Sequence, residues 1–311
     1  MSFILYCVLN TAFILLISPL LMSLIKKVKA YTQGRKGPPL LQTYYSLGKL
    51  LRKETIYSSN SSLIMRITPF INVTFLLVAS LSIPVVFIPP PVAGVGNIIL
   101  FLYLMVCAKF FMALAGLDAG STFGGMGSSR EMTFSAIIEP VTIVTFAALG
   151  LVLKTINLHE MFAATLIAPA ITNPPLLLIT LSLFIILIVE TSRIPVDNPE
   201  THLELTMIHE AMLLEYTGPN LALMETSHAI KQTLLLGIII NIVSPWGLAT
   251  APSAGGILLA TVMFLVKAGI VAVIIGLFES QVAKSRLFRL PGLFILAFFF
   301  SFLTVVFELL S

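Results

Sequence analysis

Eight long apolar runs dominate this sequence, and a chain that contains them is restricted to folds that cross a lipid bilayer. A helix needs roughly 20 mostly apolar residues to span about 30 Å of hydrocarbon. The runs lie near residues 3–25, 68–90, 97–117, 132–154, 173–191, 228–250, 256–279 and 288–310, and the fifth is the shortest. Only 10% of the 311 residues are charged, which excludes an ordinary soluble domain. We therefore predict an all-α polytopic protein with about eight transmembrane helices, a single integral membrane domain over 1–311.

Lysine and arginine are concentrated on one side of this predicted membrane domain. The loop 26–67 contains nine of the 18 basic residues, whereas the segments 91–96, 155–172 and 251–255 contain none. Because cytoplasmic loops carry the excess of Lys and Arg, we expect a prokaryotic cytoplasmic membrane protein with loop 26–67 inside and both termini outside. The net charge of +4 comes largely from this loop, so it reports orientation and does not indicate a nucleic-acid partner.

Few side chains in the sequence could hold a cofactor. Cys7 and Cys107 lie in different apolar runs and cannot build a disulfide framework or an iron–sulfur site. His202 and His209 are seven residues apart, which is about 10 Å along a helix axis, and the sequence lacks the HExxH spacing of zinc proteases. We therefore expect no cofactor, metal or catalytic group in this chain.

The acidic residues gather in one stretch. Seven of the 14 lie between Glu190 and Glu225, although carboxylates directly beside membrane spans are electrostatically expensive. Pro199 suits the first turn of a new helix, on which Glu200, Glu204 and Glu215 fall within roughly 60° of one another. We expect a Glu-rich cytoplasmic loop helix, packed in protein, whose carboxylates face a wet channel. A solvated acidic loop is the alternative.

Charged residues also lie within the apolar runs, where a charge needs a partner or water. Lys109 lies in the third run, eight residues from its basic end, so snorkelling competes with a functional position. Lys267 is near the centre of the seventh run and favours a polar pathway. Glu139 and Glu190 are candidates for a proton relay, and structural hydrogen bonding is the alternative for Glu139. Glu279 closes the seventh run and is expected to be an interfacial charge.

Two loops on the basic side have distinct compositions. Residues 33–39 combine two glycines and two prolines with two cations, which predicts a sharp turn, and an amphipathic helix follows over residues 40–51. That helix lies on the membrane or against a partner. The segment Gly116–Glu131 has five glycines, which allow tight turns and close backbone approach, and Ser128 or Ser129 is expected to cap the next helix. It lacks the order of a phosphate-binding loop.

Three motifs resemble the membrane subunit shared by respiratory complex I, where it is also called subunit 1, and the energy-converting [NiFe] hydrogenases. The similarity extends over nearly the whole chain. The motifs are Gln33-Gly34-Arg35-Lys36-Gly37-Pro38, then Gly125-Met126-Gly127-Ser128-Ser129-Arg130-Glu131 with Glu139-Pro140, and Glu190-Thr191-Ser192-Arg193-Ile194-Pro195-Val196-Asp197-Asn198-Pro199-Glu200 with Glu204-Leu205. The third is long and specific.

Two features favour the hydrogenase branch of that family. Residues 201–212, Thr-His-Leu-Glu-Leu-Thr-Met-Ile-His-Glu-Ala-Met, are similar to the formate hydrogenlyase and hydrogenase-4 membrane subunits. Quinone-reducing members usually continue Asn-Arg-Val-Gly-Pro after the motif that ends in Gly37-Pro38, whereas this chain continues Pro39-Leu40-Leu41-Gln42.

The resemblance implies a membrane anchor for a cytoplasmic redox arm. Its implied partners are membrane lipid, hydrogenase-like large and small subunits, a ferredoxin-like iron–sulfur subunit and antiporter-like membrane subunits. Those partners would carry the [4Fe-4S] clusters and the [NiFe] centre. Proton or ion coupling is expected of Glu139, Glu190, Asp197, Glu200, Glu204, Glu210, Glu215, Lys109 and Lys267. Docking of the arm is expected of Gly34, Arg35, Gly37, Pro38, Arg130, Glu131 and Arg193.

Other functions remain open at this point. The complex could be a quinone reductase of the complex I type, or a sulfur-reducing relative of the hydrogenases. A free-standing secondary ion transporter would also explain charges within the membrane. Transporters often show two halves with matching broken helices, and no such internal repeat is visible in this sequence.

Overall fold

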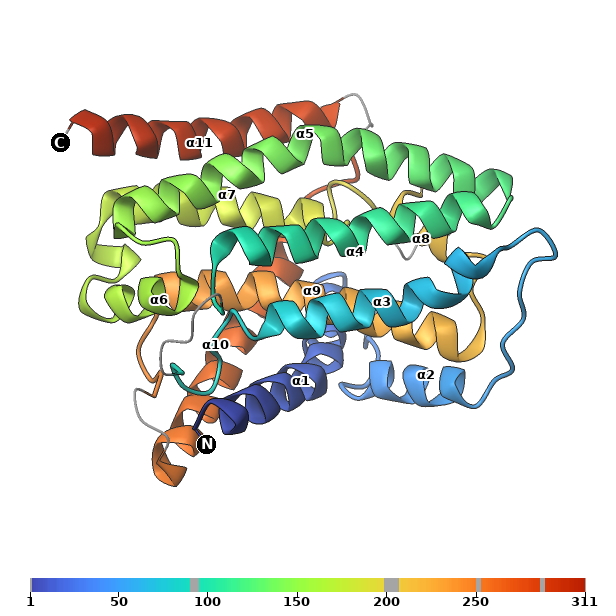
Figure 1. Cartoon of the computed structure of the whole chain (residues 1–311), viewed down its shortest axis with the longest axis horizontal. Coiled ribbons are helices and arrows are strands. Elements are labelled where there is room, and N and C mark those ends of the chain that lie inside the picture. Colours follow the sequence, from blue (N-terminus) through green and yellow to red (C-terminus); the bar gives the residue numbers. More distant parts are fainter. Residues whose placement is uncertain (1, 90–94, 199–206, 250–252, 286–288, 311) are drawn as a thin grey trace.

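The computed structural model describes residues 2–89, 95–198, 207–249, 253–285 and 289–310. Most of its long helices run along the long axis of the molecule, whereas α1 and α10 run obliquely to it (Figure 1). The helices are α1 (Ser2–Thr32), α2 (Gln42–Leu51), α3 (Leu63–Ser80), α4 (Ile98–Asp118), α5 (Thr122–Leu153), α6 (Leu158–Ile167), the 3-10 turn η1 (Ala170–Thr172), α7 (Pro174–Glu190), α8 (His209–Leu213), α9 (Gly218–Val243), α10 (Ala254–Gln281) and α11 (Leu290–Leu310).

Within the described ranges, seven helices are long and apolar enough to cross a membrane: α1, α3, α4, α5, α9, α10 and α11. The candidate for an eighth, α7, has 17 residues and is the shortest of the long helices. The predicted all-α polytopic class is therefore confirmed, and the predicted count of eight is approximate. The amphipathic helix expected over residues 40–51 is α2, and none of its ten residues, all of them described, is buried.

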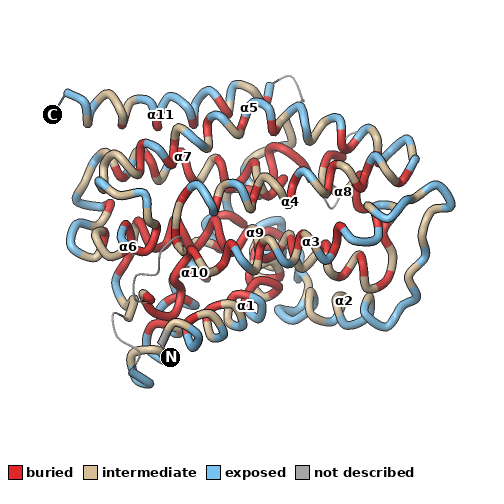
Figure 2. Tube along the Cα trace, viewed as in Figure 1, coloured by how far each residue is buried: buried red, intermediate tan, exposed pale blue. Residues whose placement is uncertain are grey.

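Helix α9 forms the centre of the bundle and packs against α1, α2, α3 and α7. Its most apolar window is 78% buried, whereas the corresponding windows of α10 and α11 are 22% buried. Figure 2 shows this difference as red along α9 and pale blue along the outer helices. Side chains on α9 are therefore held by protein on nearly every side.

Buried hydroxyl groups join the outer helices to the bundle. Thr145 of α5, Ser182 of α7 and Ser301 of α11 lie within 2.7–2.9 Å of one another at their hydroxyl oxygens. Lipid provides no hydrophobic drive between helices, so close packing and such interhelical hydrogen bonds stabilise the contact. This cluster fixes α11 against α5 and α7.

Several helix boundaries differ from the apolar runs. The run 68–90 contains only the second part of α3, which begins at Leu63 and ends at Ser80. The described residues 81–89 that follow α3 are not helical, and the amide of Asn10 donates to the carbonyls of Ser80 and Ile83. The run 228–250 likewise differs from α9, which begins ten residues earlier, at Gly218, and ends at Val243. Hydropathy shows which residues are apolar enough to lie in lipid, but it does not show where a helix ends. A helix can extend into polar sequence, as α9 does, or end within an apolar run where side chains accept or donate the hydrogen bonds of the backbone, as α3 does.

The glycine-rich segment before Glu131 has a tight turn only at its start, where Gly120 has a positive φ of 66° between α4 and α5. Helix α5 begins at Thr122, and the Ser121 side chain accepts a hydrogen bond from the Gly124 amide as its N-cap. The expected close backbone approach is confirmed: a Cβ on Gly124 would lie 2.5 Å from the carbonyl oxygen of Gly116. Neither Ser128 nor Ser129 caps this helix.

The expected Glu-rich loop helix is only partly within the described chain. Its predicted start at Pro199, together with Glu200, His202 and Glu204, lies outside the described residues. In the described remainder only the five residues of α8, His209–Leu213, are helical.

Candidate functional site

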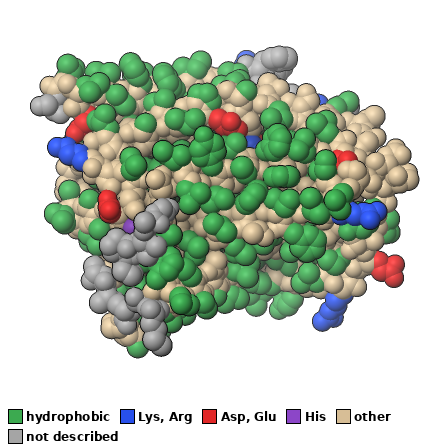
Figure 3. Space-filling view, viewed as in Figure 1, with side chains coloured by type: hydrophobic (Ala, Val, Ile, Leu, Met, Phe, Trp, Pro, Cys, Tyr) green, Lys and Arg blue, Asp and Glu red, His purple; other side chains and the backbone are tan. Residues whose placement is uncertain are grey.

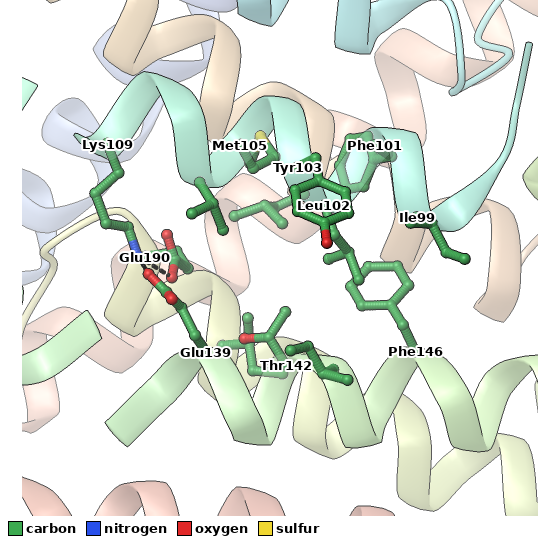
Figure 4. A pocket seen from close by; sticks show the side chains of 14 residues that line it. Ile99, Phe101, Leu102, Tyr103, Met105, Lys109, Glu139, Thr142, Phe146 and Glu190 are labelled. Carbon is green, nitrogen blue, oxygen red and sulfur yellow. Dashed lines mark hydrogen bonds and ion pairs between the residues drawn. The ribbon is translucent and has the colours of Figure 1, made fainter. Parts of the chain in front are cut away.

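A buried ion pair network lies where α7 ends. The Glu190 carboxylate accepts from two lysines, with Lys109 Nζ 2.7 Å from Oε1 and Lys231 Nζ 2.6 Å from Oε2. On the other side, the Glu139 carboxylate is 4.0 Å from Lys109 Nζ. Figure 4 shows Lys109 extended toward Glu190 and Glu139. We call the series Glu139–Lys109–Glu190–Lys231 the ion row; it joins α5, α4, α7 and α9.

The ion row has no net charge when all four groups are ionised, because it contains two ammonium groups and two carboxylates. Two cations on one carboxylate favour its ionised form. Because the Lys109, Glu190 and Lys231 side chains are only 7–13% exposed, their interactions are weakly screened by solvent. A charge added or removed at one end therefore changes the energy of the neighbouring pair, which is a property that charge transfer through a membrane protein requires.

An apolar cavity of about 350 Å3 adjoins the ion row between α4 and α5. Aromatic and aliphatic side chains line most of it, and Lys109, Glu139 and Glu190 form its polar end (Figure 4). The Glu139 side chain is 33% exposed. In Figure 3 an acidic group interrupts a broad hydrophobic face over α5. A carboxylate at this depth needs water or a protein partner beside it.

The loop after α7 is fixed by a second set of ion pairs. Arg193 Nη1 is 2.5 Å from Glu279 Oε1, and Arg193 Nη2 donates to Gln232 Oε1 at 2.5 Å. Lys29 Nζ lies 3.7 Å from Glu279 Oε2. Asp197 accepts from Lys284 Nζ and from the Ile208 amide, each at 2.8 Å. These contacts hold the loop against α9, α10 and α1.

Two charged side chains are buried in ion pairs. Arg193 is only 8% exposed and its guanidinium is paired with Glu279, while its expected part in docking the arm stays a prediction. Glu279 is 6% exposed and paired with Arg193, so it is a buried ion pair partner and not an interfacial charge. In each case the opposite charge on a distant segment offsets the cost of burial, and sequence position alone does not reveal that partner.

A polar cavity of about 170 Å3 lies between α1, α2, α8 and α9. Lys26, His209, Glu210, Glu225 and His228 are among the residues that line it. Burial, together with the nearby Glu225 carboxylate, raises the pKa of Glu210 to about 7. Burial and the Lys231 ammonium lower the pKa of His209 to about 3. Near pH 7 the Glu210 carboxyl group is therefore protonated in a fraction of the molecules, and the His209 ring is neutral.

The structure brings some predicted site residues together and separates others. Glu139, Lys109 and Glu190 meet in the ion row, and Glu131 lines small cavities beside Lys109. Glu215 is half-buried beyond α8. Lys267 donates to the carbonyls of Ser244 and Trp246, just after the end of α9. That end of α9 is about 20 Å along the helix axis from Lys231.

The residues expected to dock a cytoplasmic arm have different exposures. Gly34, Arg35 and Gly37 are exposed in the turn after α1, and Pro38 is half-buried. Arg130 Nη1 donates to the carbonyl of Met207 at 2.8 Å and so supports the start of the α8 segment.

Lys231 is the main residue that sequence reasoning missed. It lies three residues inside the predicted run 228–250, where it was not counted among the buried charges. Treating every lysine within an apolar run as a charge that needs a partner would have found it. His228 was missed as well, because an isolated histidine at the start of an apolar run carries no spacing signal.

Comparisons with known proteins agree with this architecture. A family model described as NADH dehydrogenase matches residues 4–309. Formate hydrogenlyase subunit 4 of Escherichia coli K12 is 30% identical over 303 residues, which cover 97% of this chain and 98% of that protein. Hydrogenase-4 component C of the same organism is 30% identical over 287 residues, or 91% and 89% of the two chains. A chain in the structure of the membrane-bound sulfane sulfur reductase, an archaeal respiratory membrane complex, superposes with a TM-score of 0.81 at 19% identity, covering 98% of this chain and all of that one.

Proposed function

Because this chain belongs to the NADH dehydrogenase family, we propose that it is the coupling subunit of a multisubunit [NiFe] hydrogenase or formate hydrogenlyase-type complex. It is a membrane subunit of an oxidoreductase complex, as its relatives are. In this proposal it anchors a cytoplasmic redox arm and passes a charge change from that arm to a path for H⁺ or Na⁺. The chain is not itself the redox catalyst.

The observation that carries the proposal is the ion row. Four titratable groups from four helices form a continuous series from Lys231 of α9 to Glu139 of α5, whose side chain is 33% exposed. A purely structural contact would need one pair; a series that ends at an opening in the hydrophobic face suits transfer of charge to a neighbouring subunit. Burial of such a network is weak support for stability on its own, so it needs a functional reason.

We assign the partners by position. The exposed turn with Gly34, Arg35 and Gly37, together with Pro38, is proposed to receive the cytoplasmic arm. Iron–sulfur and hydrogenase-like subunits in that arm would carry the [4Fe-4S] clusters and the [NiFe] centre. An antiporter-like membrane subunit is proposed to cover the face of α5 at Glu139. Glu200 and Glu204 remain proposed coupling residues outside the described chain.

The hydrogenase branch is favoured over the quinone branch by the extent of the similarity. Formate hydrogenlyase subunit 4 matches this chain from end to end without a large unmatched part on either side. The likeness to the sulfane sulfur reductase is one of fold, so a sulfur-reducing complex is the second candidate. An acceptor assay on the purified complex separates these possibilities, since protons, sulfane sulfur and quinone are consumed at different rates by the three kinds of enzyme.

The test uses the native complex reconstituted in liposomes, with electron transfer and ion movement measured together. Glu190→Gln keeps the side-chain shape and removes the charge that both lysines require. We expect electron transfer to continue while ion movement per electron falls about tenfold or more, within the range by which positioned acid–base groups contribute. Glu54→Gln, which alters an exposed carboxylate, is the matched control.

Assembly is checked by co-purification of the partner subunits with each variant. Undiminished ion movement per electron in an assembled Glu190→Gln complex would remove the ion row from the coupling path. Ion transport by the purified chain alone in liposomes would instead support a free-standing transporter.

A further inference from the structure

Two histidine rings face each other between the polar cavity and the ion row. His209 begins α8 and His228 lies in α9, and their ring centroids are 4.4 Å apart at an interplanar angle of 48°. Neither ring belongs to the ion row. Their position, at the boundary between two cavities, is what distinguishes them from an ordinary packed pair.

Both histidines line both cavities. The polar cavity of about 170 Å3 lies on one side of the pair, with Lys26, Glu210 and Glu225 in its wall. A smaller cavity of about 30 Å3 lies on the other side, and its wall includes Lys109, Glu131 and Lys231. The rings therefore separate a polar space near α2 from the lysines of the ion row.

Buried polar atoms at this boundary lack protein partners. Nε2 of His209, Nδ1 of His228 and Oδ1 of Asn72 are buried and have no hydrogen-bond partner within the described parts of the chain. A buried polar group without a hydrogen-bond partner is unfavourable, so three of them in one place indicate water. A water molecule occupies roughly 30 Å3 of liquid volume, so the small cavity can hold about one water and the larger cavity several.

Cationic and acidic side chains lie around the rings. Burial and the Lys231 ammonium lower the pKa of His209, so its ring is neutral, and Lys26 of α1 lines the polar cavity together with both rings. The carboxyl groups of Glu210 and Glu225 line the polar cavity, and Glu131 lies beyond the rings. A neutral imidazole has one nitrogen that donates and one that accepts, so it can hydrogen-bond to water on both sides. Metal binding is disfavoured, because no group of three His, Cys, Asp or Glu among the described residues is arranged to hold an ion.

We propose that His209 and His228 form the proton-transfer link between the water in the polar cavity and the ion row. An excess proton that enters the polar cavity from the solvent moves from hydronium to the nitrogen of one ring that carries no hydrogen, leaving neutral water behind, and that ring releases its other proton to the second ring or to water in the small cavity. The second ring passes a proton on in the same way, and reorientation restores both neutral rings. This inference rests on the proposed coupling function, for which it supplies the entry route.

The first test concerns the rings themselves. Histidines labelled with 15N are observed by solid-state NMR of the assembled complex in bilayers, and His209→Gln and His228→Gln assign the two signals. We expect two neutral rings near pH 7, each with magnetisation transfer from mobile water. Rings that are both protonated, or that show no contact with water, would overturn the proposal.

The second test concerns transfer. Glutamine fills the space of the ring and hydrogen-bonds, but it cannot accept a proton on one atom and release one from another. His209→Gln and His228→Gln should each lower ion movement per electron about tenfold or more, and the complex should still assemble. His159→Gln is the matched control, since His159 is also buried but bonds the Leu81 carbonyl in another part of the molecule.

The same liposome assay separates this inference from the proposed function. Loss of coupling in Glu190→Gln with full coupling in both histidine variants would refute the histidine link and leave the function standing. Full coupling in all three variants would refute both. Loss in all three, with the His159→Gln control active, supports both.

Discussion

At the scale of single residues, the arrangement of Glu190 explains why a lysine is tolerated deep in α4. Snorkelling is unnecessary for Lys109, because its ammonium meets a carboxylate at 2.7 Å inside the bundle. The second oxygen of that carboxylate is taken by Lys231. Removing one member of such a pair typically costs about 3–5 kcal/mol, since an uncompensated buried charge remains. The ionised forms of these three residues therefore stabilise one another, and a change of charge at one alters the energy of the other two.

Glu210 gives the structure a pH dependence that can be measured. The folded protein holds its proton up to a pKa of about 7, whereas an unperturbed glutamate releases it near 4.5. Folding therefore binds a proton between these values, and this contribution to the free energy of unfolding falls as the pH rises from about 4.5 to about 7. Glu210→Gln should remove this pH-dependent contribution to the free energy of unfolding. At pH 8, where the parent must bury an ionised carboxylate, the variant should therefore be more stable by on the order of 1 kcal/mol.

The measurement compares thermal unfolding midpoints of the parent and Glu210→Gln at pH 5.5 and pH 8 in the same lipid–detergent mixture. The difference between the two proteins should grow toward pH 8. Glu54→Gln, which alters an exposed carboxylate, controls for the loss of a negative charge. A parent and a Glu210→Gln variant with parallel pH profiles would contradict the assignment.

At the scale of helices, the glycines at the start of α5 determine where α8 can lie. A Cβ on Gly127 would be 2.9 Å from the Cβ of Ala211 and 2.9 Å from the carbonyl oxygen of Ile208. Glycine is a poor helix former, so its presence here is explained by the close approach of the two segments. Because α8 begins with His209, this contact also positions the histidine pair.

Gly127→Ala and Gly125→Ala form a matched pair within the same helix turn. Gly125 has no described neighbour within 4 Å of an added Cβ, so its substitution should be neutral or stabilise α5 by up to about 1 kcal/mol. Gly127→Ala should push α8 away, lower the unfolding midpoint and accelerate proteolysis between α7 and α9. Equal midpoints and equal cleavage rates for the two variants would show that the contact is not tight.

The features that could be predicted from the sequence are those that belong to a single helix. The apolar runs gave the polytopic class, and the depth of Lys109 and Glu139 marked them as charges that need partners. Pairing across helices was not predictable, because the sequence does not show which segment lies beside Lys231 or Glu279 until α9 and α10 are placed beside α7 and its loop. The glycines of α5 allowed both tight turns and close backbone approach, and the sequence could not show which segment they contact. Glu200 and Glu204 stay predictions.

At the scale of the whole molecule, polar features are distributed along the long axis. The amphipathic helix α2 and the short helix α8 lie toward one end, and both termini lie toward the other (Figure 1). The outer helices α10 and α11 present largely exposed apolar surface, as lipid or partner helices require. This division agrees with the uneven distribution of lysine and arginine, from which the positive-inside rule predicts that the end with α2 lies in the cytoplasm.

That orientation predicts opposite labelling of two engineered cysteines. In a background with Cys7→Ala and Cys107→Ala, Gly48→Cys places a thiol on the exposed side of α2, and Leu310→Cys places one at the exposed end of α11. A membrane-impermeant maleimide should label Leu310→Cys in intact spheroplasts, because that end of α11 is expected to face outward. It should label Gly48→Cys only in inverted vesicles, where the positively charged side is turned out. The reverse pattern would place the polar cavity outside the cell, away from any cytoplasmic redox arm, and the coupling proposal would then have no source of charge.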